Sequence, residues 1–252
     1  MRKPLLAANW KMYKTVDEAR AFVTAFLPLV KGHTRDEIVV CPAMPLIAAV
    51  AEGCKGSNVE VGAQDMNAVE EGAYTGGSSC AMIKSLGCTH VIIGHSERRQ
   101  YCHETDEIVN AKLKTALKAG LTPIVCVGEL DAEREAGHTS EVLRRQTSRA
   151  IAEISPEHAK MLVIAYEPVW AIGTGKTATP EVAAEAHLTI RTTLANILGR
   201  DFADGVRILY GGSVKPENAS SLLNQPEIDG ALVGGASLDP KSFAKIVNYA
   251  EF

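Results

Sequence analysis

Short apolar runs alternate with longer amphipathic segments along the whole chain of 252 residues. The short runs are rich in Val and Ile and have no polar face, which is typical of strands buried on both sides. They predict eight strands, at Leu5–Lys11, Ile38–Cys41, Val59–Gln64, His90–Gly94, Pro123–Gly128, Leu162–Glu167, Val206–Tyr210 and Gly230–Gly234. In the segments between these strands, apolar residues recur every three or four positions. This period predicts helices at Val16–Val30, Ile108–Ala119, Glu141–Ile154, Pro180–Leu198, Pro216–Leu223 and Pro240–Tyr249.

The regular order of strand and helix predicts the fold. Repeated strand–helix units form parallel sheets with right-handed crossovers. Eight units in 252 residues match a closed (β/α)8 barrel, and no linker interrupts them. We therefore expect an α/β protein with a single barrel domain over residues 1–252. A doubly wound open sheet is the alternative, but it usually has a glycine-rich turn after its first strand, and the segment Trp10–Lys14 contains no glycine.

One long segment, Asp65–Ser79, shows neither helical nor strand periodicity. Loops of this length in compact domains are usually functional or make contacts. Its centre, Ala73–Thr75, is uncharged. We expect a subunit contact and hence a homodimer, and the alternative is an ordinary surface loop.

Composition excludes several classes of protein. The net charge of −4 and the absence of clustered Lys and Arg argue against nucleic-acid binding. No apolar run approaches the roughly 20 residues that cross a membrane, and the apolar stretch near the N-terminus is too short for a signal peptide. The six cysteines form no CxxC pair and no metal-ligand spacing. Reduced thiols, a cytoplasmic location and no bound metal are the expectation.

Polar residues follow several predicted strands at their carboxyl ends, where barrel enzymes build their active sites. Asn9 and Lys11 lie at the end of the first strand, the segment 95–97 follows the fourth, and Glu167 ends the sixth. Pro168 ends that strand because it has no N–H to donate. The segment Pro168–Ala178 then has an apolar start and a glycine-containing tip, as a mobile lid would. A carboxylate beside a lid is typical of acid–base chemistry on a small enclosed substrate.

Two glycine-rich turns, 211–213 and 234–235, follow the seventh and eighth strands. Backbone N–H groups in such turns can approach an anion closely, and these two loops of a barrel often bind phosphate. The turns therefore predict a phosphate monoester as ligand.

Five segments in order along the chain resemble the motifs of the triosephosphate isomerase family. They are Asn9–Met12, Gly94–Arg99, Ala165–Gly175, Tyr210–Val214 and Leu232–Ala236. The resemblance implies a barrel enzyme of glycolysis and gluconeogenesis that interconverts dihydroxyacetone phosphate and glyceraldehyde 3-phosphate through an enediolate, without a cofactor or a metal. It also implies that the barrel acts as a homodimer.

The resemblance also implies roles for individual residues. Glu167 would move a proton between two neighbouring carbons, and His95 would polarise the carbonyl and carry protons between the oxygens. Lys11 and Asn9 would bind the substrate and stabilise the enediolate oxygen. Four residues would donate backbone N–H groups to the phosphate: Gly173, Ser213, Gly234 and Gly235.

Supporting residues are expected around these. Ile172 and Leu232 would form an apolar roof that makes Glu167 a stronger base by burial. Ser96 is expected to cap a helix whose N-terminus keeps His95 neutral. Glu97 would balance or orient Lys11, or pair with an arginine.

Two other functions remain open from the residues. An aldolase could use Lys11 as a Schiff-base amine. An inactive protein could bind or organise phosphorylated metabolites, although such a descendant would typically have lost Glu167, His95 or Lys11. Cys126 is expected to pack only, and Arg98 and Arg99 to be structural or interfacial.

Overall fold

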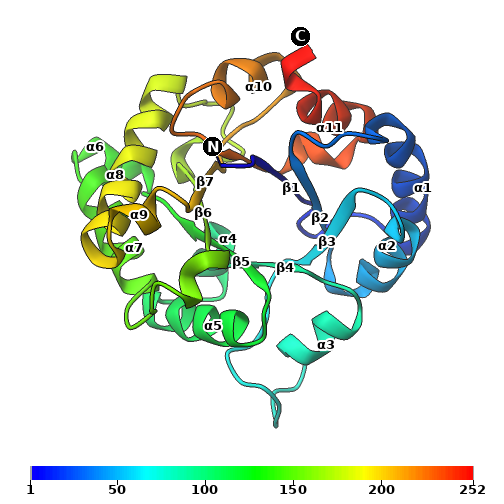
Figure 1. Ribbon diagram of the computed structural model, residues 1–252, viewed down its shortest axis with the longest axis horizontal. Helices are drawn as coiled ribbons and strands as arrows, with labels where there is room; N and C mark the ends of the chain where they lie inside the picture. Colours follow the sequence, from blue (N-terminus) through cyan, green and yellow to red (C-terminus); the bar gives the residue numbers. More distant parts are fainter. Residues whose placement is uncertain (1, 252) are drawn as a thin grey trace.

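A closed, fully parallel barrel organises the chain (Figure 1). The computed structural model describes residues 2–251, with side chains except at 158, 159 and 251. The strands are β1 Leu5–Asn9, β2 Glu37–Cys41, β3 Val59–Ala63, β4 His90–Ile93, β5 Thr122–Val127, β6 Val163–Tyr166, β7 Arg207–Tyr210 and β8 Gly230–Val233. Closure comes from β8 pairing with β1, with Ala8 opposite Val233. The predicted (β/α)8 barrel is thus confirmed, although β1 ends at Asn9 and leaves Lys11 in the following turn.

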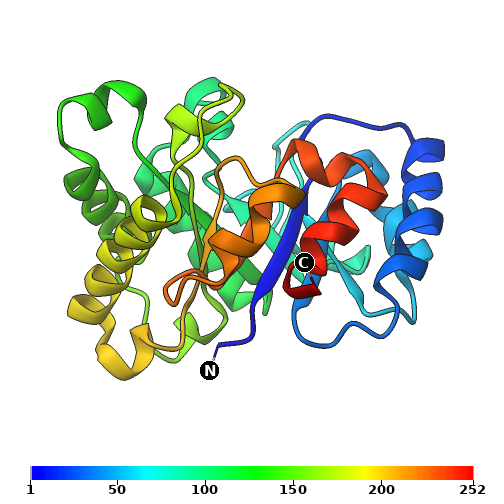
Figure 2. The same cartoon turned by 90° about the horizontal axis from the view of Figure 1, so that it is seen from above.

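Helices surround the barrel on the outside (Figures 1 and 2). They are α1 Val16–Phe26, α2 Ile47–Cys54, α3 Cys80–Ser85, α4 Ser96–Tyr101, α5 Asp106–Lys118, α6 Asp131–Glu135, α7 Thr139–Ala150, α8 Pro180–Leu198, α9 Arg200–Ala203, α10 Pro216–Leu223 and α11 Pro240–Val247. All six predicted helices are present. The sequence prediction missed α2, α3, α6 and α9, whose short lengths show little of a 3.6-residue period. A helix near Ser96 was expected without bounds, and it is α4.

Apolar side chains form two separate cores. The larger one lies between the strands and the helices and includes stacked rings of Phe26 and Phe243, whose centroids are 5.2 Å apart. The smaller one fills the barrel with alternating residues of the strands, Leu5, Ala7, Val39, Cys41, Ile92, Ile124, Cys126, Val163, Ala165, Leu209 and Leu232. Because this interior is packed, polar groups of the barrel gather at its two ends.

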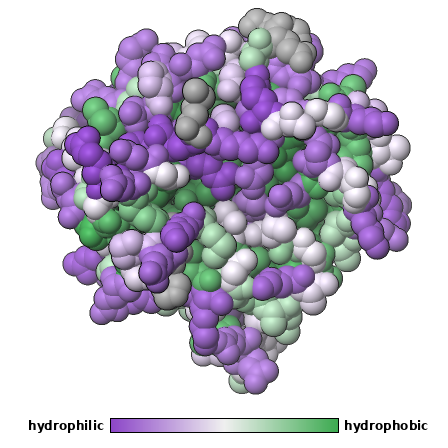
Figure 3. All heavy atoms as spheres, viewed as in Figure 1, coloured by the Kyte–Doolittle hydropathy of each residue, from purple (hydrophilic) through white to green (hydrophobic). Residues whose placement is uncertain are grey.

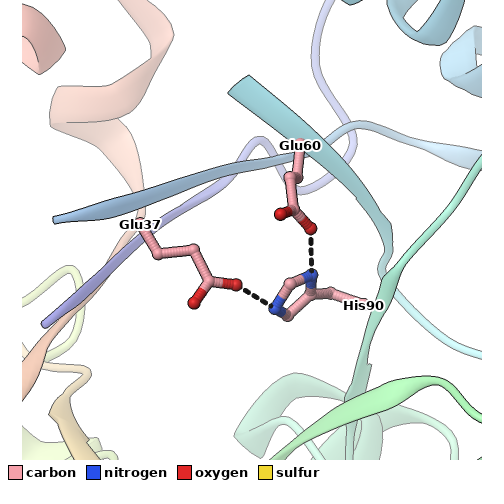
Figure 4. A group of neighbouring side chains, drawn as sticks. All are labelled: Glu37, Glu60 and His90. Carbon is pink, nitrogen blue, oxygen red and sulfur yellow. Dashed lines mark ion pairs between the residues drawn. The ribbon is translucent and has the colours of Figure 1, made fainter. Parts of the chain in front are cut away.

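The end formed by the first residues of the strands is charged. His90 is 2% exposed and lies between two carboxylates, with Nε2 2.9 Å from Glu37 Oε1 and Nδ1 3.5 Å from Glu60 Oε2 (Figure 4). Arg207 completes the group by an ion pair with Glu37. The two carboxylates approach different ring nitrogens, so this arrangement suits an ion-pair network better than ligands of a single metal ion. Figure 3 shows hydrophilic residues across the centre of the face seen along the barrel.

The loop 65–79 contains no helix or strand and projects beyond α3 in Figure 1. Tyr74 near its tip is 56% exposed. Among the described residues, no helix is long and apolar enough to span a membrane. All six cysteines are free, and only Cys102 is exposed.

Candidate active site

A cavity of about 780 Å³ opens at the carboxyl ends of the strands. Ten predicted site residues line it: Asn9, Lys11, His95, Glu167, Ile172, Gly173, Ser213, Leu232, Gly234 and Gly235. They come from loops after five different strands, so the closed barrel brings them together. The other two, Ser96 and Glu97, stand behind this lining and contact Glu167 and Lys11.

Glu167 is 2% exposed and is held on both carboxylate oxygens. Its Oε1 lies 2.8 Å from His95 Nε2, and its Oε2 accepts a hydrogen bond of 2.8 Å from the Ser96 amide. Its own amide donates to Val127 O at the end of β5. These contacts place a carboxylate and an imidazole side by side at the mouth of the barrel.

The expected effect of burial on Glu167 is outweighed in this structure. Burial raises its pKa, but the His95 ring, the Ser96 amide and the Lys11 ammonium favour the ionised form, and the net pKa lies below the ordinary value. Burial thus acts on the pKa of Glu167 in the expected direction, and the contacts with His95, Ser96 and Lys11 outweigh it in this arrangement. A carboxylate that turned away from His95 and Ser96 would lose these stabilising contacts and become more basic.

His95 is the N-cap of α4, and its Nδ1 accepts a hydrogen bond of 3.2 Å from the Glu97 amide. Ser96 was the predicted cap and is instead the first helical residue. Because Nδ1 accepts a hydrogen bond, a neutral ring carries its proton on Nε2, which faces Glu167. Burial lowers the pKa of His95, but the Glu167 and Glu97 carboxylates together outweigh it, and the net shift is upward. This direction differs from the expected effect of the helix N-terminus and depends on Glu167 staying beside the ring.

Lys11 has a backbone φ of 52°, which is unusual for a residue with a side chain. Two side chains stabilise this turn: Asn9 Oδ1 accepts from the Lys11 amide at 3.0 Å, and Gln64 Nε2 donates to the Lys11 carbonyl at 2.9 Å. The turn directs the ammonium to Glu97 Oε1, 2.6 Å away. Backbone strain retained in this way is common at functional sites.

The predicted lid begins with the 3₁₀ turn Val169–Ala171 and rises at the end of the barrel opposite to the N-terminus (Figure 2). Glu129, fully buried, accepts from Trp170 Nε1 at 2.8 Å and from Tyr166 OH at 3.0 Å. At the other end of the lid, the Ala178 amide donates to Tyr210 OH at 3.3 Å. The tip 173–177 is exposed. Hydrogen bonds therefore hold both ends of the lid, whereas its tip is exposed and makes few contacts.

The two glycine turns line the same cavity as His95. Gly211 donates its amide to Tyr166 O at 2.7 Å, which fixes the start of the first turn against β6. Asn218 Nδ2 donates to Ser213 O at 3.0 Å, so the Ser213 carbonyl is held by α10. In the second turn Ser237 Oγ donates to the carbonyls of Val233 and Gly234. Because hydrogen bonds hold these carbonyls in place, the backbone of the two turns has a fixed shape that can bind an anion.

Three supporting residues escaped the sequence analysis. Gln64 and Glu129 each lie at or just after a strand end, where other residues were assigned as candidates, but no pattern distinguished them. Tyr210 was included in a strand and in a family motif, but no role was given to it. Their position at the carboxyl edge of the sheet was the one available signal.

Comparison with known proteins identifies close relatives. The family model described as triosephosphate isomerase matches residues 4–250. A protein of Solibacter usitatus named triosephosphate isomerase is 56% identical over 249 residues, which is 99% of this chain and 100% of the relative. Proteins with the same name from Moorella thermoacetica and Geotalea uraniireducens are 57% and 53% identical, and the alignments cover 99% or more of each chain.

Proposed function

The chain belongs to the triosephosphate isomerase family, and from this premise we propose how its residues carry out the family's reaction. The enzyme interconverts dihydroxyacetone phosphate and glyceraldehyde 3-phosphate, an aldose–ketose isomerisation of glycolysis and gluconeogenesis. The observation that supports the assignment of roles most strongly is the meeting of Glu167, His95 and Lys11 at one cavity. Residues 1–252 act as one catalytic domain.

Glu167 is the base. In the arrangement described above its carboxylate is bound to Ser96 and His95, so it must rotate toward the substrate to reach a carbon-bound proton. Rotation breaks both contacts, and the contribution of His95 and Ser96 to its lowered pKa is lost. Ile172 and Leu232 line the same cavity and surround the rotated carboxylate with apolar groups, which favours proton uptake.

The remaining polar groups stabilise the negative charge that develops on oxygen. His95 donates from Nε2, and Lys11 and Asn9 approach from the carboxyl end of β1. Preorganised donors at such an oxygen usually make the largest single contribution to lowering the barrier. Glu97 holds the Lys11 ammonium at 2.6 Å, and it thereby keeps the cation in place before the substrate enters.

The phosphate binds at the two glycine turns, through the backbone of Ser213, Gly234 and Gly235, with Gly173 added when the lid closes. Closure excludes water from the enediolate, which would otherwise lose its phosphate by elimination. The exposed tip of the lid and the hydrogen bonds at both of its ends support this role.

The aldolase alternative is less consistent with the site. A Schiff-base lysine must be a neutral amine when it attacks a carbonyl. In this structure Lys11 Nζ is bound to Glu97 Oε1 at 2.6 Å, so the amine would first have to leave this contact. The inactive alternative is disfavoured because all three proposed catalytic residues are present and converge.

We propose that the protein is a cytoplasmic homodimer. The free cysteines suit a reducing compartment. The projecting loop 65–79, with exposed Tyr74, would bind a second subunit. Sedimentation analysis of the purified protein should give twice the mass of the chain, and a monomer at all concentrations would contradict the proposal.

The function is tested by a coupled assay for triose phosphate interconversion, without added metal or nucleotide. We expect turnover in both directions. Glu167→Asp shortens the base by one methylene group and should lower kcat by about 100-fold or more with little change in KM. Unchanged turnover in this variant would contradict the role of Glu167, and borohydride trapping of substrate on Lys11 would support the aldolase.

A further inference from the structure

Arg99 on α4 binds the ends of two neighbouring strands at once. Its Nε donates to Gly94 O at 2.9 Å, and its Nη2 donates to Cys126 O at 3.3 Å. Its Nη1 lies 2.6 Å from Asp106 Oδ1, in the first turn of α5. The side chain is only 18% exposed. Each guanidinium nitrogen thus has a partner of its own.

The first of these carbonyls belongs to the peptide that precedes His95. Gly94 has a φ of 68°, and a Cβ there would lie 2.6 Å from Val109 Cγ2 and 3.3 Å from Arg99 Nη2. Packing and the Arg99 hydrogen bond therefore fix the direction in which the chain leaves β4. That direction determines where the His95 ring points.

The second carbonyl belongs to β5, the strand to which the Glu167 amide donates a hydrogen bond. Cys126 O is bound by Arg99, and the next carbonyl along β5, Val127 O, accepts the amide of Glu167 at 2.8 Å. One guanidinium and two successive peptides therefore connect the backbone before His95 to the backbone of Glu167.

We propose that Arg99 is a positioning residue for the isomerisation, which sets the separation of the His95 ring and the Glu167 carboxylate. This inference rests on the roles proposed above for these two side chains. Arg99 touches neither the substrate nor the cavity of about 780 Å³ that contains the phosphate turns. Its loss should therefore affect catalysis more than substrate binding.

Lysine cannot replace this arginine. Three partners in different directions require a planar group with several donors, whereas a lysine has a single nitrogen on a flexible stem. A misplacement of about 1 Å between reacting groups can cost about 100-fold in rate. We expect kcat of Arg99→Lys to fall about 10- to 100-fold, with KM changed less than about threefold.

Arg191 provides a matched control for the loss of a buried, multiply bonded arginine. It lies on α8, its side chain is 7% exposed, and it donates to the carbonyls of Ala203 and Val206 and pairs with Glu227 and Asp229. None of these partners lines the catalytic cavity. Arg191→Lys should therefore lose stability while kcat of the folded protein stays within about threefold of the wild type.

The experiment measures kcat and KM of both lysine variants, and of Arg99→Ala and Arg191→Ala with and without low guanidinium chloride. Guanidinium should restore part of kcat in Arg99→Ala only. An inactive wild type would refute the proposed function itself. An active wild type with unchanged kcat in Arg99→Lys, or an equal loss of kcat in Arg191→Lys, would overturn the positioning role alone.

Discussion

Gly211→Ala tests whether packing behind Glu167 determines the position of the base. A Cβ at Gly211 would lie 2.9 Å from Glu167 Cγ and 3.1 Å from Tyr166 O. Normal contacts between carbon atoms are about 3.5 Å or longer, so the Glu167 side chain must move by about 0.6 Å. It cannot move freely, because Ser96 and His95 hold its carboxylate. We expect kcat to fall by about 10- to 100-fold, which corresponds to about 1.4–2.7 kcal/mol of activation free energy.

The coupled isomerase assay measures this effect, and Gly53→Ala is the matched control. A Cβ at Gly53, on α2, would lie 2.8 Å from Val23 Cγ1, which is a similar clash at a residue that does not line the cavity. The control should keep kcat within about threefold of the wild type. If Gly211→Ala retained full kcat, or if both variants lost it equally, the position of Glu167 would not depend on this contact.

Three further predictions concern Lys11, the lid and the charged group around His90 at the other end of the barrel. Lys11→Ala should lower kcat/KM by at least about 100-fold while circular dichroism stays unchanged, because one preorganised donor is lost; an active variant would exclude this role. Tyr210→Phe removes the acceptor of the Ala178 amide and should lower kcat by about 3- to 10-fold and increase phosphate release, which a phosphate assay would detect. The pKa of Glu37 is lowered to about 2 from 4.5, since His90 and Arg207 outweigh the effect of burial. Its stabilisation is therefore complete above pH 4.5 and lost as the pH falls toward 2. Urea unfolding should show that the difference in free energy of unfolding between Glu37→Gln and the wild type shrinks as the pH falls from 4.5 toward 2. A difference that stays constant would contradict a stabilising role for ionised Glu37.

The alternation of apolar runs predicted the fold because nearly all residues of the eight strands are buried, on both faces of the sheet. Helices such as Pro180–Leu198 were predicted at their observed bounds, since proline at the first position and a long amphipathic stretch mark both ends. The short helix Ser96–Tyr101 was expected only as a helix capped near Ser96, and its bounds were not predicted because its six residues give no period. Its N-cap is a histidine ring, which no capping rule would suggest.

The site was predictable where one residue type at a strand end implies one chemistry, as with Glu167 and the glycine turns. It was not predictable where the role depends on a distant partner. Gln64 stabilises the turn at Lys11 across 53 positions, and Glu129 holds Trp170 across 41 positions. The net direction of the Glu167 pKa could not be predicted, because the sequence does not show that His95 and Ser96 contact its carboxylate.

The transfer of a carbon-bound proton through Glu167 is tested most directly by isomerisation in deuterium oxide. Proton NMR would follow dihydroxyacetone phosphate and its product with wild-type enzyme and with Glu167→Gln. In the wild type the carboxylate takes up the carbon-bound proton, exchanges it with solvent and should return deuterium to carbon. The variant should neither isomerise nor exchange. Isomerisation or exchange at the wild-type rate in Glu167→Gln would show that Glu167 is not the base.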